Sequence, residues 1–121
     1  MLRLIGYWRN EQHPELPDPG VLVDESWDDD DRHVVAVYYA RGTVARSFMG
    51  YSPCRLCGMN NGAVEYTDGV YAWPEGFVHC IEEQGVRPPA EVVEHALTRM
   101  NAIEAAELDT SWWISQTRPS R

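Results

Sequence analysis

The clearest hydrophobic pattern lies in the last third of the chain. Apolar side chains there recur every three to four residues, at Val93, Leu97, Met100 and Ile103. This spacing is typical of one face of an α-helix, and the preceding Pro88-Pro89 suits a helix start. We expect a helix from these prolines to Asp109-Thr110-Ser111, followed by a Trp112-Trp113-Ile114 segment that packs back on the domain.

A second helix is expected between the four aspartates at 28–31 and Gly42. Aspartate at a helix start complements the helix dipole, and glycine favours the residue after a helix end. Residues 34–39 between them are rich in β-branched side chains, which makes a strand the alternative. We interpret the aspartates as a solvated helix start, because they lack the alternating ligands of an EF-hand calcium loop.

Three extended runs follow, at 43–51, 63–67 and 70–73. Asp68-Gly69 joins the last two and is typical of a type I′ hairpin turn. The three runs therefore predict an antiparallel meander.

A short helix is expected after the meander, because Pro74 suits a first helical position and Gly85 a helix end. Its apolar face would be formed by Phe77, Cys80 and Ile81. At the N-terminus, residues 1–9 alternate weakly and indicate a strand or an arm packed on the core. The prolines of segment 11–20 exclude a regular helix or a central strand there.

These elements predict an α+β fold. A small antiparallel sheet, a meander that carries a CxxC knuckle at its first turn, would pack against two or three helices. The 121 residues fit a single domain, 1–121, with a Pro-rich loop at 11–20 and a flexible tail at 115–121.

The net charge of the chain limits the classes of partner that it can bind. Nineteen acidic residues stand against ten basic ones, a formal charge of −9. This is the wrong sign for binding phosphates or an anionic membrane surface, and no apolar run approaches the ~20 residues of a membrane span. We therefore expect neither nucleic acid nor membrane as a partner, and a protein partner suits the charge better.

The cysteines and the N-terminus indicate the cytoplasm. Three cysteines, an odd number, fit metal binding or reduced thiols better than a disulfide framework. The N-terminal residues lack the pattern of a signal peptide.

The motif Cys54-Arg55-Leu56-Cys57-Gly58 has the spacing of a zinc knuckle. Two thiolates two residues apart can bind one tetrahedral Zn²⁺, and the glycine lets backbone amides close around the sulfur. His79 is the expected third ligand. The candidates for the fourth position are Cys80, Glu83, His95 or a water molecule. Cys80 is equally a buried apolar thiol, and the alternative for the knuckle is a reduced or redox-active cysteine pair.

An enzymatic alternative comes from His13-Pro14-Glu15 together with Pro53-Cys54-Arg55-Leu56-Cys57. These residues match the HxE and PCxxC signature of zinc-dependent nucleobase deaminases, in which Glu moves protons to and from a zinc-activated water. Both motifs open helices in those enzymes, whereas here prolines surround His13 and a glycine-rich turn follows Cys57. We therefore expect a non-enzymatic, zinc-binding interaction module. A zinc hydrolase or deaminase using His13, Glu15, Cys54 and Cys57 is the alternative.

The chain also resembles a family of small actinobacterial proteins of unknown activity. The resemblance is carried by residues 50–58, Asn61-Gly62, Glu65, Thr67-Asp68-Gly69, Trp73-Pro74-Glu75-Gly76, His79 and Val86-Arg87. The family pattern, WPEGLxHYVxxHxVRLP, has a second histidine where this chain has Gln84, and a tyrosine where it has Cys80. The resemblance implies a Cys₂His₂ set in the family, so that here Cys80 has taken over the fourth position or the site is weaker. It also implies a helix after the aspartates.

Overall fold

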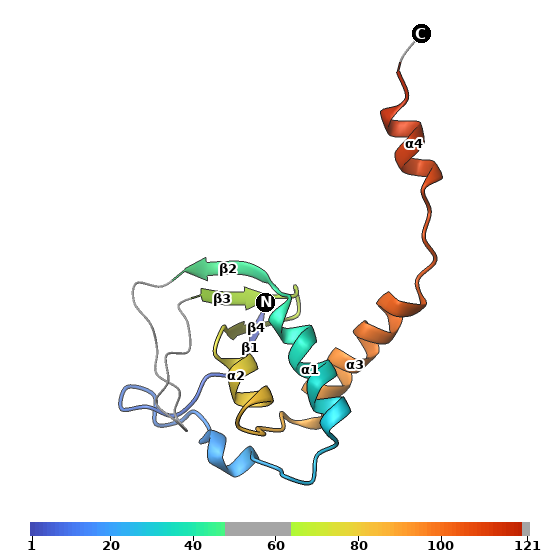
Figure 1. Ribbon diagram of the computed structural model, residues 1–121. Coiled ribbons are helices and arrows are strands. Elements are labelled where there is room, and N and C mark those ends of the chain that lie inside the picture. The colour runs from blue at the N-terminus through green and yellow to red at the C-terminus, as the bar shows by residue number, and fades with distance from the viewer. Residues whose placement is uncertain (48–63, 120–121) are drawn as a thin grey trace.

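The computed structural model describes residues 1–47 and 64–119 (Figure 1). The helices and strands in these ranges are β1 (Arg3–Leu4), the 3-10 helix η1 (Pro19–Leu22), α1 (Asp29–Ala40), β2 (Thr43–Ser47), β3 (Val64–Thr67), β4 (Tyr71–Pro74), α2 (Phe77–Glu82), α3 (Ala90–Ala105) and α4 (Ser111–Thr117). The predicted α+β class is confirmed.

In the described ranges, one sheet has the strand order β1-β4-β3-β2. Strands β2, β3 and β4 form the predicted antiparallel meander. Strand β1 pairs parallel to β4, with Arg3 opposite Tyr71. The sheet is therefore mixed: the predicted antiparallel meander is extended by one parallel strand, because the N-terminal segment adds along the free edge of β4.

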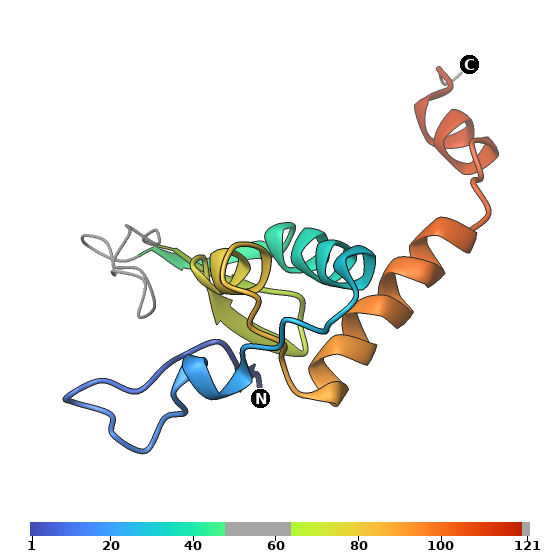
Figure 2. The same ribbon diagram turned by 60° about the horizontal axis from the view of Figure 1, so that its bottom comes forward.

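Helix α1 forms where the aspartates predicted it. The Asp28 side chain accepts a hydrogen bond from the Asp31 backbone N–H at 3.2 Å, which caps the first turn. The β-branched and aromatic residues that favoured a strand instead supply the buried face of this helix. Helix α1 packs against both α2 and α3, and Figure 2 shows α1 and α2 together on one face of the sheet.

The core is an aromatic cluster between β4, α1 and α2. The Tyr39 ring meets Trp73 edge-on at 4.8 Å between centroids and Phe77 at 5.3 Å. Trp73 is fully buried and donates from Nε1 to the Tyr39 carbonyl at 2.8 Å. Each such aromatic pair adds ~0.5–1.5 kcal/mol beyond the burial of its area. Trp73 therefore lies at the centre of the core.

Two local predictions are corrected at the ends of β4. Pro74 is the last residue of β4 opposite Glu65, so α2 begins only at Phe77. The Asp68-Gly69 hairpin is confirmed, but its turn is not type I′. That turn needs a positive φ at Asp68, and among the described residues only glycines have one. Gly69 takes the positive φ, +91°, and the Asp68 carboxylate accepts the Val70 and Tyr71 backbone N–H groups.

The C-terminal predictions are also corrected. Helix α3 ends at Ala105, and of its predicted apolar stripe Val93 is buried whereas Ile103 is 67% exposed. The segment Trp112-Trp113-Ile114 does not pack back, because α3 carries the chain away from the body (Figure 1). It lies in α4, which extends to Thr117 and so includes the start of the predicted tail. None of the helices in the described part of the chain has the length and apolar content needed to cross a bilayer.

Candidate functional site

The predicted knuckle, Cys54 to Cys57, lies outside the described residues, but both of its flanks are described. Ser47 at the end of β2 pairs with Val64 at the start of β3. The carbonyl of Val64 accepts a hydrogen bond from the Glu75 backbone N–H at 2.9 Å. Glu75 stands two residues before the first residue of α2. Val64 therefore lies beside the chain that leads into α2, and Ser47 lies one strand further away.

Helix α2 carries the other two predicted ligands, His79 and Cys80. His79 is half-buried. Cys80 is fully buried and packs with Val86, Trp8 and Leu22. Cys80 thus lies on the apolar face, as expected. Because neighbouring positions on a helix diverge by ~100°, the two side chains can reach one ion only near the start of the helix, and His79 is the third residue of α2. Glu83, a further candidate, is exposed at the end of this helix.

His95 belongs to a different cluster, between α3 and the β3–β4 turn. Its Nε2 lies 2.7 Å from Asp68 Oδ2, and its ring meets Tyr71 edge-on at 4.8 Å. Tyr71 is the first residue of β4, whereas α2 follows the last. We therefore do not retain His95 as a zinc ligand. Across residues 1–47 and 64–119, no three His, Cys, Asp or Glu side chains gather into a metal-binding group.

Asp68 is a residue that the sequence indicated only as part of a turn. Tyr38 donates to its Oδ2 at 2.5 Å, and the backbone N–H groups of Val70 and Tyr71 donate to its Oδ1. Burial raises the pKa of Asp68, but the hydrogen bonds from Tyr38, Tyr71, His95 and Val70 outweigh it and lower the pKa to about 2. The cluster is a charged clamp joining α1, α3 and the turn. Its partners are too far apart in sequence for a motif to indicate them.

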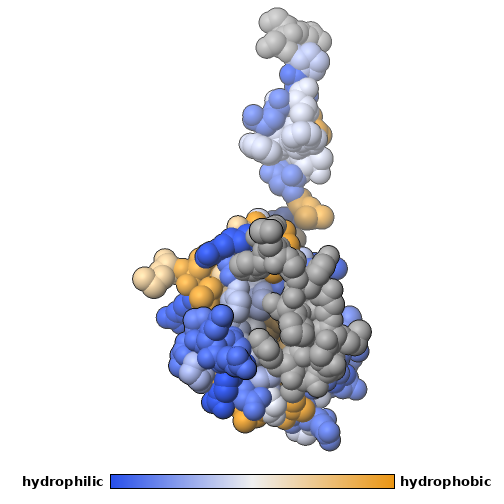
Figure 3. All heavy atoms as spheres, turned by 90° about the vertical axis from the view of Figure 1, so that its left-hand side faces the viewer, coloured by the Kyte–Doolittle hydropathy of each residue, from blue (hydrophilic) through white to orange (hydrophobic). Residues whose placement is uncertain are grey.

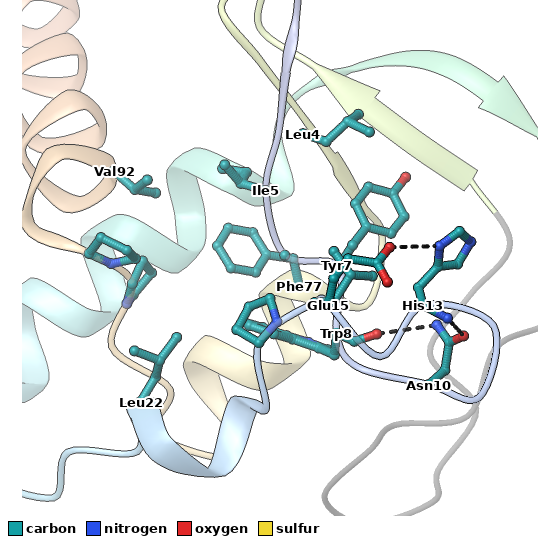
Figure 4. Close-up of a pocket in the computed structure, with 15 residues that line it drawn as sticks. Leu4, Ile5, Tyr7, Trp8, Asn10, His13, Glu15, Leu22, Phe77 and Val92 are labelled. Atoms are coloured by element: carbon teal, nitrogen blue, oxygen red, sulfur yellow. Dashed lines mark hydrogen bonds and ion pairs between the residues drawn. The ribbon is translucent and has the colours of Figure 1, made fainter.

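A pocket of about 620 Å³ opens between the N-terminal segment, α2 and the start of α3. Figure 4 shows Ile5, Phe77 and Val92 along its wall, with His13 and Glu15 at the other end. The residues that line it are Leu4, Ile5, Gly6, Tyr7, Trp8, Asn10, His13, Glu15, Leu16, Pro17, Leu22, Phe77, Pro88, Pro89 and Val92. This volume and the mostly apolar lining are typical of a binding site.

A buried carboxylate, Glu65, holds the N-terminal wall of this pocket. Glu65 on β3 is 5% exposed, accepts a hydrogen bond from the Tyr7 hydroxyl and lies 3.2 Å from Arg46 Nε. Burial and the Glu65 carboxylate raise the pKa of Tyr7, so its hydroxyl remains protonated as the donor. The hydrogen bond from Tyr7 to Glu65 thus fastens the chain after β1 to the sheet.

His13 and Glu15, the residues of the enzymatic alternative, contact each other at the pocket rim. His13 Nδ1 lies 3.0 Å from Glu15 Oε1, and both side chains are exposed. The backbone N–H of Glu15 and the His13 side chain lower the pKa of this carboxyl. The motif lies in a turn and not at a helix start, as its prolines predicted. Its cysteine partners lie outside the described residues.

No family model, curated protein or solved structure matches the chain. The resemblance to the actinobacterial family stays a prediction. Function is therefore inferred from the residues and their geometry.

Proposed function

We propose that this chain is a small cytoplasmic protein that holds one structural zinc ion and acts as a non-enzymatic protein-interaction module. Cys54, Cys57 and His79 would be ligands, with Cys80 as the fourth. The observation that carries the zinc proposal is the backbone pairing at the flanks of segment 48–63. Val64 pairs with Glu75, just before α2 and its His79, and Ser47 pairs with Val64 one strand further away, so both flanks lie near the entry to this helix. Two thiolates from a loop and a third ligand from a facing helix are a common zinc arrangement.

The interaction role is supported by the exposed apolar residues beyond α3. Trp112 and Trp113 are 63% and 61% exposed, and Leu108 is 95% exposed. Contiguous apolar side chains of this kind mark surfaces that contact a protein or membrane partner. The net charge of −9 disfavours an anionic membrane, so a protein is the proposed partner.

The test begins with zinc content, measured by mass spectrometry on the purified full-length protein. We expect one zinc per chain, which Cys54→Ser, Cys57→Ser and His79→Ala each abolish or sharply reduce. The matched control is His13→Ala, because His13 is a ligand only in the deaminase alternative. It should leave the zinc content unchanged. Cys80→Ser removes the proposed fourth ligand and should weaken zinc binding.

The role of the metal is tested by thermal unfolding with and without a chelator. A structural zinc stabilises the folded state, so its removal should lower the melting temperature. Protein that contains no zinc would overturn the proposal. Zinc that depends on His13 but not on His79, and that leaves without changing the melting temperature, would favour the hydrolase or deaminase alternative.

A further inference from the structure

Helix α4 is apolar, exposed and too short to be stable alone. It spans Ser111–Thr117, seven residues, whereas isolated helices need ~12–15 residues to be even marginally stable in water. Trp112, Trp113 and Ile114 are each at least half exposed, and Figure 3 shows the C-terminal segment standing clear of the body. A short helix of this composition gains stability by docking its apolar side chains on a protein surface.

The charge of this segment is opposite to that of the body. Residues 110–121, which we call the arm, contain Arg118 and Arg121 and no acidic residue. All 19 Asp and Glu of the chain, against eight Arg, lie in residues 1–109. An arm that is aromatic and cationic is therefore complementary to the body of its own protein.

The pocket on the body has the matching chemistry. Its walls include Ile5, Phe77 and Val92, and the Glu15 carboxylate lies on its rim. Its volume of about 620 Å³ falls within the ~300–1,000 Å³ of sites that enclose an organic ligand. A tryptophan side chain can enter such a cavity, while an arginine further along the arm meets Glu15, whose carboxylate is exposed beside His13 on the rim.

The arm of the same chain is poorly placed to fill this pocket. The pocket lies at the start of α3, at Pro89 and Val92, whereas the arm follows its end at Ala105. The helix between Val92 and Ala105 is about 20 Å long at 1.5 Å per residue. The six steps from Ala105 to Ser111 span at most ~20–22 Å, so the linker would have to run fully extended back along α3, and Figure 2 shows α3 directing it away from the body. The arm of a second molecule has no such restriction.

We propose that the arm of one copy docks in the pocket of a second copy, and the reverse, in a two-fold dimer. Each buried tryptophan contributes ~150–250 Å². A reciprocal exchange involves four of them, and the pocket walls lose a comparable area, so the interface reaches the ~1,200 Å² or more of specific complexes. Trp112 and Trp113 diverge by ~100° on the helix, so one enters the pocket and the other packs on its rim. This inference rests on the proposed interaction role and names its partner.

The test is the molar mass of the full-length protein in solution, measured by sedimentation over a range of concentrations. Wild type should be a dimer. The double variant Trp112→Ala/Trp113→Ala and the pocket variant Leu16→Asp should each weaken dimerisation by at least ~30-fold. Val21→Asp is the matched control, because Val21 is 76% exposed on η1 and does not line the pocket. It should remain dimeric.

Mixing the two disrupted variants gives the sharper result. Leu16→Asp retains an intact arm and the tryptophan variant retains an intact pocket, so together they should form a heterodimer with one exchanged arm. A monomeric wild type, or a dimer that Leu16→Asp leaves intact, would overturn the exchange. Zinc content measured on the same samples separates the two proposals, because a zinc-loaded monomer contradicts only this inference and a zinc-free dimer contradicts only the metal site.

Discussion

Asp68 joins three parts of the chain that are remote in sequence. Its carboxylate accepts hydrogen bonds from Tyr38 on α1 and from the β3–β4 turn, and it pairs with His95 on α3. The side chain is only 10% exposed. A buried carboxylate is stable only when donors compensate its lost hydration, and here four donors do so.

The first prediction concerns Asp68→Asn. The pKa of Asp68 in the folded protein is about 2, below the value of about 3.9 in an unfolded chain. The carboxylate therefore stabilises the fold fully above pH ~4, and this contribution is lost as pH falls toward 2. Asparagine should lower the free energy of unfolding by ~1–2 kcal/mol at neutral pH and flatten its decline between pH 4 and 2.

Urea unfolding at several pH values measures both effects. Asp109→Asn is the control, because this aspartate also accepts hydrogen bonds from the residue two positions on, Ser111, but lies on the exposed segment after α3. Its substitution should leave the unfolding of the body unchanged. An equal loss in the two variants would show that the Asp68 clamp contributes nothing beyond its turn.

The second prediction compares two glycines. A Cβ at Gly42 would lie 2.7 Å from Trp73 Cζ2 and 2.8 Å from Tyr66 Cβ. Trp73 is enclosed by the core and cannot move aside, so Gly42→Ala should cost ~2–3 kcal/mol. Gly69 has φ +91°, but a Cβ added there would meet no atom within 4 Å, so Gly69→Ala should cost about 1 kcal/mol through backbone strain alone. Denaturant unfolding measures the free energy of unfolding of both variants. A larger loss of stability in Gly69→Ala than in Gly42→Ala would contradict the prediction.

The elements that the sequence predicted correctly have local causes. The Asp28 cap and the acidic first turn start α1, and these signals prevailed over the β-branched residues because a helix can bury the same side chains on one face. The Asp68-Gly69 pair closes a hairpin through bonds made within a few residues. Cys80 could likewise be placed on an apolar face from spacing alone.

The features that were missed have causes elsewhere in the chain. A strand was one expectation for residues 1–9, but its partner was not predicted, because Arg3 of β1 lies opposite Tyr71 and nothing near residue 3 indicates that pairing. Pro74 extends β4 because Glu65 lies opposite it, so the pairing overrides its preference for a helix start. Tryptophans predict burial, yet Trp112 and Trp113 are exposed since the preceding helix leaves the body.

The candidate sites also differ in whether their residues are close together or far apart in sequence. The CxxC spacing predicts two zinc ligands from sequence, whereas the pocket and the Asp68 clamp each need residues from three or more segments. Such sites appear only when the fold brings those segments together. The fourth zinc ligand remains a prediction for the same reason, since it depends on how α2 is placed relative to Cys54 and Cys57, which are distant from it in sequence.

At the scale of the whole molecule, the structure is a packed body with one helix that leaves it. The first half of α3 is held by the core through Val92, Val93 and Ala96, which are buried. Residues 101–119 are exposed throughout. A segment with fewer buried contacts is locally less stable. The backbone of α3 should therefore open more easily toward the C-terminal end of the helix.

The last prediction applies this gradient to hydrogen exchange. Backbone amides near Val93 and Ala96 should exchange at least about tenfold more slowly than those at 101–105 of the same helix, because the former open only with the core. The amides of α4 should exchange almost freely at high dilution and become protected as concentration rises, since the proposed arm exchange orders them by mass action. The Leu16→Asp variant provides the comparison at each concentration. Protection of α4 that is independent of concentration and unchanged in this variant would mean that the helix is ordered without the pocket of a second copy.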